Sequence, residues 1–308
     1  MRISNAIELI DLAIYSHHAL IMTDFHIGYE EALNKQGILV PRFQFQEIMK
    51  RLEKIFERLK GKKIGTIVIS GDLKHEFGTI SDQEWRNTLR LLDYFSRHAK
   101  HIVLLKGNHD TILGPIAEKR NVTLADYFII SKDGGIAFIK EKNNNGKTTI
   151  LRKPIGEITT MTEYSSYKNA TKKENTIQKL ITRGKSYLTQ EKKNKLKKNG
   201  DKNILVAHGD KIPENEILAM AGTIIIGHEH PAISIKDGIR SETFKCYLIG
   251  KWKGKNLIAQ PSFNLITEGT DVMKEEVLSP FLKGNVKSCR VIVVADKLYD
   301  FGLVKGLG

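Results

Sequence analysis

The chain has 308 residues, 41% of them hydrophobic, which is enough for one large domain with a sizeable core. No apolar run reaches the roughly 18 residues of a membrane span, and we expect no signal peptide and two reduced core cysteines, Cys246 and Cys289, as in a cytoplasmic protein. The formal net charge of +14 favours anionic partners.

Three apolar segments of the N-terminal half are predicted to be strands with helices between them. The segments are residues 18–23, 64–69 and 101–106. Apolar residues recur at helical spacing from Phe45 to Leu59, and Ser81 and Glu84 form a capping box that opens a second helix. This alternation predicts a parallel sheet with crossover helices.

Polar side chains follow each predicted strand. They are Asp24 and His26 after the first strand, Asp72 after the second, and Asn108, His109 and Asp110 after the third. Functional side chains collect just past the carboxyl ends of strands in α/β sheets. Asp24 and His26 also share a face, because residues two apart in an extended chain point the same way. The sequence therefore predicts a site at this edge of the sheet.

The segment 140–202 interrupts this alternation. It holds 17 Lys and Arg residues against 6 Asp and Glu residues, so it carries +11 of the net charge of +14. We expect a basic, Lys-rich insertion at 140–202 in a domain formed by residues 1–139 and 203–308. This insertion either contacts nucleic-acid phosphates or is a solvated loop.

Strand patterns resume after the insertion. The segment 203–207 ends in His208, and the segment 223–226 ends in Gly227-His228-Glu229-His230. Five further strand patterns span residues 232–236, 243–250, 256–260, 289–295 and 297–304. We expect these to be antiparallel and to build a second sheet, which gives a sandwich with helices outside.

The polar clusters together predict a metal site. The candidate ligands are Asp24, His26, Asp72, Asn108, His208, His228 and His230. Seven ligands are too many for one ion and suit two ions that share a carboxylate. The set contains no thiolate, and its imidazole, carboxylate and amide groups suit Mn, Fe, Zn, Co or Ni.

These motifs resemble the five motifs of the calcineurin-like metallophosphoesterases, in the same order. They are Asp24-x-His26, Gly71-Asp72, Gly107-Asn108-His109-Asp110, His208-Gly209 and Gly227-His228-Glu229-His230. Within that superfamily, residues 71–78 and 260–264 resemble the archaeal SbcD-related phosphoesterases and the bacterial ligase-associated DNA repair nucleases. Two features depart from the family pattern. The basic insertion is not part of that pattern, and we find no counterpart of the long C-terminal extension with which repair nucleases bind their ATPase partner.

The resemblance implies a fold, a ligand set and a mechanism. The fold is a four-layer αββα sandwich of two mixed sheets flanked by helices. Two divalent ions, in the first place Mn, would be bound. One would bind Asp24, His26, Asp72 and His230, and the other would bind Asp72, Asn108, His208 and His228. A metal-bound hydroxide would attack a phosphodiester, while His109 stabilises the oxyanion or protonates the leaving oxygen and Asp110 orients the His109 ring. Apart from the resemblance, Lys74 and His75 lie just past Asp72 in the sequence, so they either contact the substrate phosphate or belong to a solvated loop.

Three functions remain open from the sequence. The first is a nuclease that acts on DNA or RNA. Such a nuclease could have a DNA-repair helicase or ligase as its partner and could form a homodimer. The second is a phosphodiesterase or phosphatase for nucleotides or cyclic nucleotides. The third is a partner-binding scaffold without catalysis, which the complete ligand set disfavours.

Overall fold

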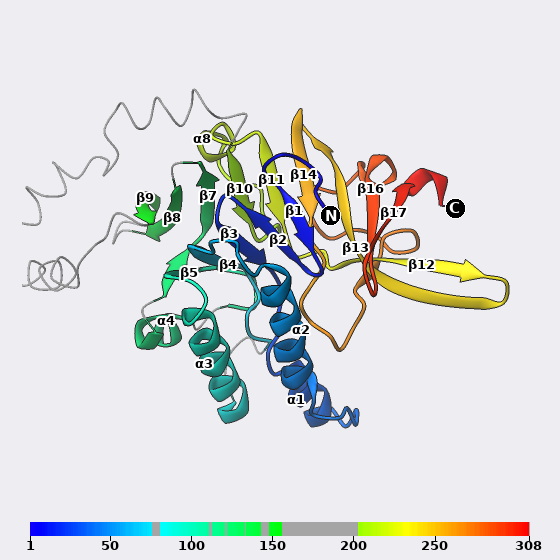
Figure 1. Cartoon of the computed structure of the whole chain (residues 1–308), viewed down its shortest axis with the longest axis horizontal. Coiled ribbons are helices and arrows are strands. Elements are labelled where there is room, and N and C mark those ends of the chain that lie inside the picture. The colour runs from blue at the N-terminus through cyan, green and yellow to red at the C-terminus, as the bar shows by residue number, and fades with distance from the viewer. Residues whose placement is uncertain are drawn as a thin grey trace, which may run out of the picture.

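The computed structural model describes residues 1–75, 81–110, 113–120, 122–132, 134–142, 148–155 and 203–307. Within them the chain forms two β-sheets, of six and eleven strands. Helices α1 to α4 gather on one side, next to the six-stranded sheet, and the short helix α8 lies on the other side of the molecule (Figure 1).

The six-stranded sheet carries the first three polar clusters. Its strands follow one another in chain order. The order is β1 (Glu8–Ile10), β2 (Ala13–Ser16), β3 (Ala19–Met22), β4 (Thr66–Ser70), β5 (His101–Leu105) and β6 (Thr123–Ala125). The strands from β3 to β6 are parallel, as predicted for β3, β4 and β5, whereas β1, β2 and β3 form an antiparallel meander. The sheet is therefore mixed.

The eleven-stranded sheet carries the remaining clusters. Its strands are β7 (Tyr127–Ser131), β8 (Gly134–Lys142), β9 (Thr148–Ile155), β10 (Ile204–Ala207), β11 (Thr223–Ile226), β12 (Pro231–Asp237), β13 (Arg240–Trp252), β14 (Lys255–Ala259), β15 (Thr270–Asp271), β16 (Arg290–Val294) and β17 (Leu298–Leu303). The five strands predicted to be antiparallel, β12, β13, β14, β16 and β17, pair antiparallel with one another. The sheet as a whole is mixed, because β10 and β14 both run parallel to β11.

The helices follow the strands after loops that carry the polar clusters. They are α1 (Tyr29–Lys35), α2 (Gln44–Arg58), α3 (Asp82–Ser96), α4 (Gly114–Arg120) and α8 (Asn215–Leu218), with 3-10 turns at Val286–Ser288 and Val304–Gly306. The predicted capping interaction is present, since the Ser81 hydroxyl accepts a hydrogen bond from the Glu84 N–H at 3.1 Å. No helix in the described part of the chain is long and apolar enough to cross a membrane.

Two apolar cores hold the layers together. Alternate residues of the second sheet face opposite sides, as the two-residue period of a strand requires. Val206, Ile225 and Ile258 pack toward the first sheet, whereas Leu205, Ile224 and Leu257 pack on the outer face with α8 and Phe281. Each fully buried side chain of this kind stabilises the fold by roughly 1.5–3 kcal/mol. The sandwich of two mixed sheets expected from the sequence is therefore confirmed, with α8 and the loop around Phe281 as a thin outer layer.

Part of the predicted insertion, residues 140–142 and 148–155, lies in strands of the second sheet. Strands β8 and β9 form a hairpin that pairs Lys142 with Thr148 and Gly135 with Ile155, and β8 also pairs with β7. Residues 148–155 therefore extend the second sheet. Residues 143–147 and 156–202 of the predicted insertion lie outside the described residues.

Candidate metal centre

The seven candidate ligands lie at the carboxyl ends of strands from both sheets. Asp24 and His26 follow β3, Asp72 follows β4, Asn108 follows β5, His208 follows β10, and His228 and His230 follow β11. A short polar contact ties the two sheets together at this edge, where the Ser70 hydroxyl donates to the Ala207 carbonyl at 2.9 Å. Within the first sheet, the Thr23 hydroxyl donates to the Ser70 carbonyl at 2.8 Å.

Five of these residues have a left-handed backbone. The φ angles are 53° for Asp24, 45° for His26, 45° for Asp72, 65° for His228 and 49° for His230. A positive φ is uncommon for residues other than glycine, and it costs of order 1–3 kcal/mol where the surroundings impose it. The backbone at this edge therefore holds an unfavourable conformation that brings the side chains together.

The first cluster consists of Asp24, His26 and His230. The two imidazoles face one another, with 3.3 Å between their Nε2 atoms. His230 Nε2 also lies 3.3 Å from Asp24 Oδ1. The other carboxylate oxygen of Asp24 accepts a hydrogen bond from the His228 N–H at 2.9 Å. One oxygen of Asp24 is therefore used by the main chain, and the other points at the imidazole nitrogens.

The second cluster consists of Asp72, Asn108, His208 and His228. His208 Nε2 lies 3.0 Å from Asn108 Oδ1, 3.2 Å from His228 Nδ1 and 3.4 Å from Asp72 Oδ2. The other ring nitrogen, Nδ1, lies 3.1 Å from the Ser70 carbonyl. Because a carbonyl only accepts, Nδ1 carries the proton, and Nε2 of the neutral ring is the atom that can bind a metal.

The donors fit a divalent cation. Asp24 Oδ1 is fully buried and has no hydrogen-bond partner, although a buried carboxylate oxygen normally has one. Burial opposes ionisation of Asp24 and Asp72, but the neighbouring histidines, His230 and His208 above all, outweigh it and hold both carboxyl pKa values low. Burial also lowers the pKa of His26 to about 3, so its ring is neutral, as a ligand must be.

His208 shows where positive charge is favoured. Burial disfavours its charged form, but the hydrogen bond to Asp72 and the charge of Asp24 outweigh burial and raise its pKa to about 10. The two carboxylates therefore stabilise positive charge at this place, whether an imidazolium or a metal ion carries it.

Glycines make room for the ligands. A Cβ atom at Gly107 would lie 2.1 Å from Asp72 Oδ1, and one at Gly71 would lie 2.1 Å from His208 Nδ1. A Cβ atom at Gly227 would lie 1.9 Å from the Thr23 hydroxyl and 2.5 Å from Asp24 Oδ2. The absence of a side chain at these glycines therefore leaves the space that the side chains of the neighbouring ligands occupy.

His109 sits at the first cluster and is tied to the second. Its ring lies edge-on to His26, with 5.1 Å between ring centroids. Its N–H donates to Asp72 Oδ1 at 2.9 Å, and its Nδ1 donates to the His75 carbonyl at 2.7 Å. The resemblance implied that Asp110 orients the His109 ring. In the structure the His75 carbonyl does so instead. The Asp110 carboxylate instead accepts from the Gly107 N–H at 3.1 Å.

The sequence of these clusters matches a known family. The sequence model of the calcineurin-like phosphoesterases matches residues 17–232, which include all seven candidate ligands. The chain belongs to the calcineurin-like phosphoesterase family. It is accordingly a metal-dependent phosphoesterase, since members of this family use divalent metals, and the His and Asp clusters are able to hold such ions. A search of curated proteins gave no match.

One solved structure shares the fold at low sequence identity, and two others are less similar in structure. A nuclease of Pseudomonas putida named MPE is 14% identical, with a TM-score of 0.50 over 95% of this chain and 93% of that one. The protein AQ665 of unknown function from Aquifex aeolicus is 14% identical, with a TM-score of 0.29 over 68% of this chain and 77% of that one. A double mutant of Vps29 from Entamoeba histolytica is 13% identical, with a TM-score of 0.28 over 92% and 99%.

The two residues predicted to contact the substrate phosphate, His75 and Lys74, differ in their position at the site. His75 is half-buried beside the first cluster, with its Nδ1 3.4 Å from His26 Nδ1 and its ring against Tyr29. Lys74, in contrast, is fully buried, and its Nζ donates to the His109 carbonyl at 2.8 Å. The prediction that Lys74 meets the substrate was wrong, because its side chain is buried and its ammonium group binds the main chain at His109.

Three residues that support the ligands were not predicted to do so. Glu84 accepts from the His75 N–H at 2.9 Å, so the first turn of α3 fixes His75. Glu229 accepts from the N–H groups of Leu278 and Ser279 at 2.9 and 2.8 Å and so anchors the turn between His228 and His230. Lys245 holds residues 262–268 beside Asp24. Only Glu84, as part of a capping box, and Glu229, inside a ligand motif, gave a signal in the sequence.

Proposed function

We propose that this phosphoesterase is a phosphodiesterase that cleaves nucleic acid with two divalent metal ions. One observation carries the two-ion part. Asp72 Oδ2 lies 3.9 Å from His26 Nε2 in the first cluster and 3.4 Å from His208 Nε2 in the second. A carboxylate within reach of both clusters is the shared ligand that two neighbouring ions need.

The residues divide between the two ions as follows. Asp24, His26, Asp72 and His230 would hold one ion, and Asp72, Asn108, His208 and His228 would hold the other. Imidazole, carboxylate and amide donors without thiolate favour Mn, with Fe, Zn, Co and Ni as alternatives. Ions bound there would lower the pKa of a water molecule and neutralise charge on the phosphate.

His109 is placed to handle the leaving oxygen. The His75 carbonyl holds the Nδ1 proton, so a protonated ring offers its second proton, on Nε2, to the substrate. His109 is held at two places. The His75 carbonyl fixes the orientation of its ring, and Asp72 binds its main-chain N–H. Such fixation is what proton transfer to a leaving group requires.

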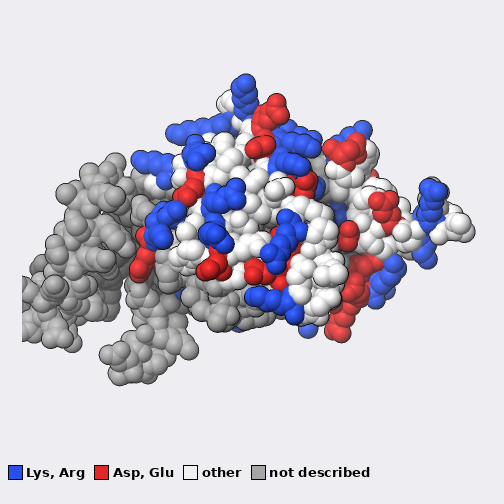
Figure 2. Space-filling view, turned by 90° about the horizontal axis from the view of Figure 1, so that it is seen from below, with Lys and Arg blue, Asp and Glu red and all other residues white. Residues whose placement is uncertain are grey.

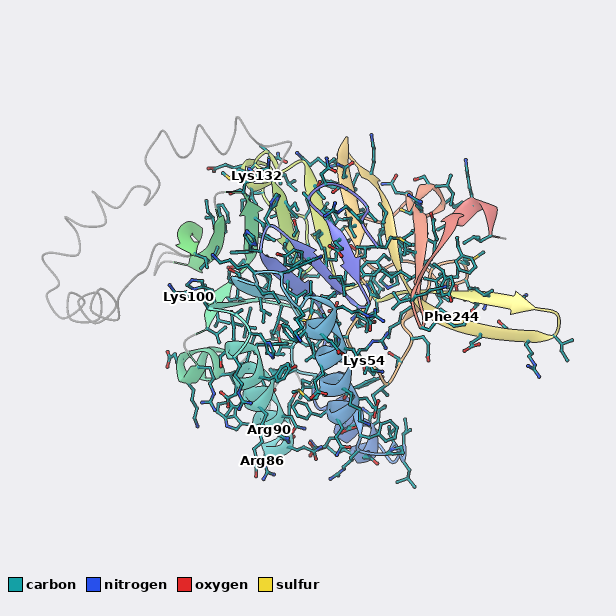
Figure 3. All side chains as sticks on the ribbon, in the orientation of Figure 1. Lys54, Arg86, Arg90, Lys100, Lys132 and Phe244 are labelled. Atoms are coloured by element: carbon teal, nitrogen blue, oxygen red, sulfur yellow. The ribbon has the colours of Figure 1, made fainter. Side chains whose placement is uncertain are left out.

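Two observations support nucleic acid as the substrate class. The fold is shared over most of both chains with the P. putida nuclease. The chain also has a net charge of +14, and residues 140–202 carry +11 of it. On the face shown in Figure 2, basic and acidic side chains are interspersed. Lys54 of α2 and Arg86 and Arg90 of α3 are exposed (Figure 3). The electrostatic attraction for phosphates therefore rests mainly on the segment 140–202.

A comparison of substrates tests this proposal. With Mn²⁺, the wild-type protein is offered single-stranded DNA, RNA, a free cyclic nucleotide and a phosphate monoester. We expect cleavage of at least one oligonucleotide at a higher kcat/KM than of the small molecules, and no cleavage by Asp72→Asn. Preference for the cyclic nucleotide or the monoester would replace the nuclease by a small-molecule enzyme. A repair-protein partner and a homodimer remain predictions of the same proposal.

A further inference from the structure

A cavity of about 490 Å³ opens beside the second cluster. It lies between the chain that follows β5, the strands β6 and β7, and the chain that follows β10. Gly107, Asp110 and His208 form the wall that it shares with the metal centre. Its volume falls within the roughly 300–1,000 Å³ of small-molecule sites. Other cavities, of about 290 and 420 Å³, touch none of the candidate ligands.

The cavity has an apolar floor. Leu113 and Tyr127 are almost fully buried there, and Leu124 is half-buried. Apolar side chains of this kind suit the face of an aromatic or heterocyclic ring, which gains by leaving water.

The rim is polar, with balanced charge. Lys106 Nζ lies 3.6 Å from an Asp126 carboxylate oxygen, and Lys211 Nζ lies 3.1 Å from an Asp210 oxygen. Each lysine therefore faces a carboxylate, and the rim has no excess of positive charge to attract a second phosphate. Neighbouring ammonium and carboxylate groups instead match the edge of a nucleobase, which presents both acceptors and donors.

We infer that this cavity is the subsite for a nucleobase attached to the phosphate at the metal centre. The inference rests on the proposed function only for the position of the phosphate. It adds that the enzyme recognises a nucleotide through its base and not through the phosphate alone. A base can reach the cavity only when it is unstacked, so single-stranded substrates should be preferred.

Calorimetric titration of the Mn²⁺-loaded protein tests this inference without requiring turnover. The probes are adenosine 5′-monophosphate and ribose 5-phosphate, which share the phosphate and sugar and differ in the base. We expect the nucleotide to bind at least about 5-fold more tightly, the low end of what stacking of one base contributes. Leu124→Trp, which fills the cavity, should remove the difference, and Leu298→Trp, at a half-buried strand leucine in another cavity, should keep it.

Equal affinities of the wild-type protein for the two probes would overturn the inference, whether or not Leu124→Trp folds. Failure of the proposed nuclease function would appear elsewhere, as absence of oligonucleotide cleavage. The expected preference for the nucleotide together with that absence would keep the subsite and point to a small nucleotide as the substrate.

Discussion

The main-chain N–H of His109 donates to Oδ1 of Asp72 at 2.9 Å. The residue proposed to protonate the leaving group is therefore fixed directly to the carboxylate proposed to join the two ions. The proposed metal-binding and proton-transfer roles would therefore be coupled through this contact.

Replacement of His109 should separate these two roles. In His109→Ala the main-chain N–H to Asp72 remains, so two metal ions should still bind. We expect kcat for a phosphodiester to fall by roughly 10²–10⁴-fold, as for other acid–base groups. Single-turnover kinetics with a measured metal content gives both values. A rate within a few-fold of the wild type would show that His109 is not the proton donor.

Gly107 should tolerate no side chain. A Cβ atom there would meet Asp72 Oδ1 at 2.1 Å, so Gly107→Ala should push the shared carboxylate aside. We expect a loss of metal affinity or activity of about 10–100-fold or more, as when groups that orient metal ligands are removed. Gly65→Ala is the control, because the nearest atom to its Cβ would be 3.8 Å away. Wild-type metal affinity in Gly107→Ala would contradict the position assigned to Asp72.

Lys245 should give the stability of the protein a specific pH dependence. Its Nζ donates to Ser262 Oγ at 2.9 Å and to the carbonyls of Thr267 and Glu268 at 2.6 and 3.1 Å. Burial lowers its pKa to about 7 from 10.5. Between these values the unfolded chain binds a proton that the folded chain does not, so the free energy of unfolding should rise with pH from about 7 to 10.

Denaturant unfolding of Lys245→Met measures this contribution. The variant should lack that rise. At pH 9 it should also be less stable by about 1–3 kcal/mol, because the acceptors in residues 262–268 lose their donor. Lys251→Met, at an exposed lysine on the same strand, should behave as the wild type. Parallel pH profiles for Lys245→Met and the wild type would exclude a titrating Lys245.

The basic segment should govern the salt dependence of nucleic-acid binding. Replacement of residues 156–202 by a Gly/Ser linker keeps the β8–β9 hairpin and all seven candidate ligands. We expect weaker oligonucleotide binding and a flatter salt slope, by about 0.7–0.9 log units per log salt for each phosphate that the protein no longer neutralises. Turnover of a small chromogenic diester should persist. Unchanged oligonucleotide affinity across salt concentrations would assign this segment to a solvated loop.

The sequence was sufficient to predict the elements that carry the ligands. Each ligand motif follows an apolar run, and such runs end at one edge of a sheet, so Asp24, Asp72 and His208 could be grouped without coordinates. The parallel course of β14 could not be predicted, because strand direction depends on how the β12–β13 hairpin folds back.

The support of the site was predicted less well than its ligands. Lys74 follows Asp72 closely, and proximity in sequence suggested a substrate contact, but the chain direction after Asp72 buries its side chain under His109. Asp110 is likewise adjacent to His109, yet neighbouring side chains in a turn diverge, and the ring meets the His75 carbonyl. Contacts of this kind depend on the turn conformation, which spacing alone does not reveal.

The most direct test of the two-ion centre is a crystal structure of the Mn²⁺-loaded protein with anomalous scattering data. We predict two Mn²⁺ peaks per chain, about 3.5–4 Å apart, with the Asp72 carboxylate between them, Asp24, His26 and His230 on one ion, and Asn108, His208 and His228 on the other. A single peak in crystals of fully active, Mn²⁺-saturated enzyme would contradict the two-ion centre.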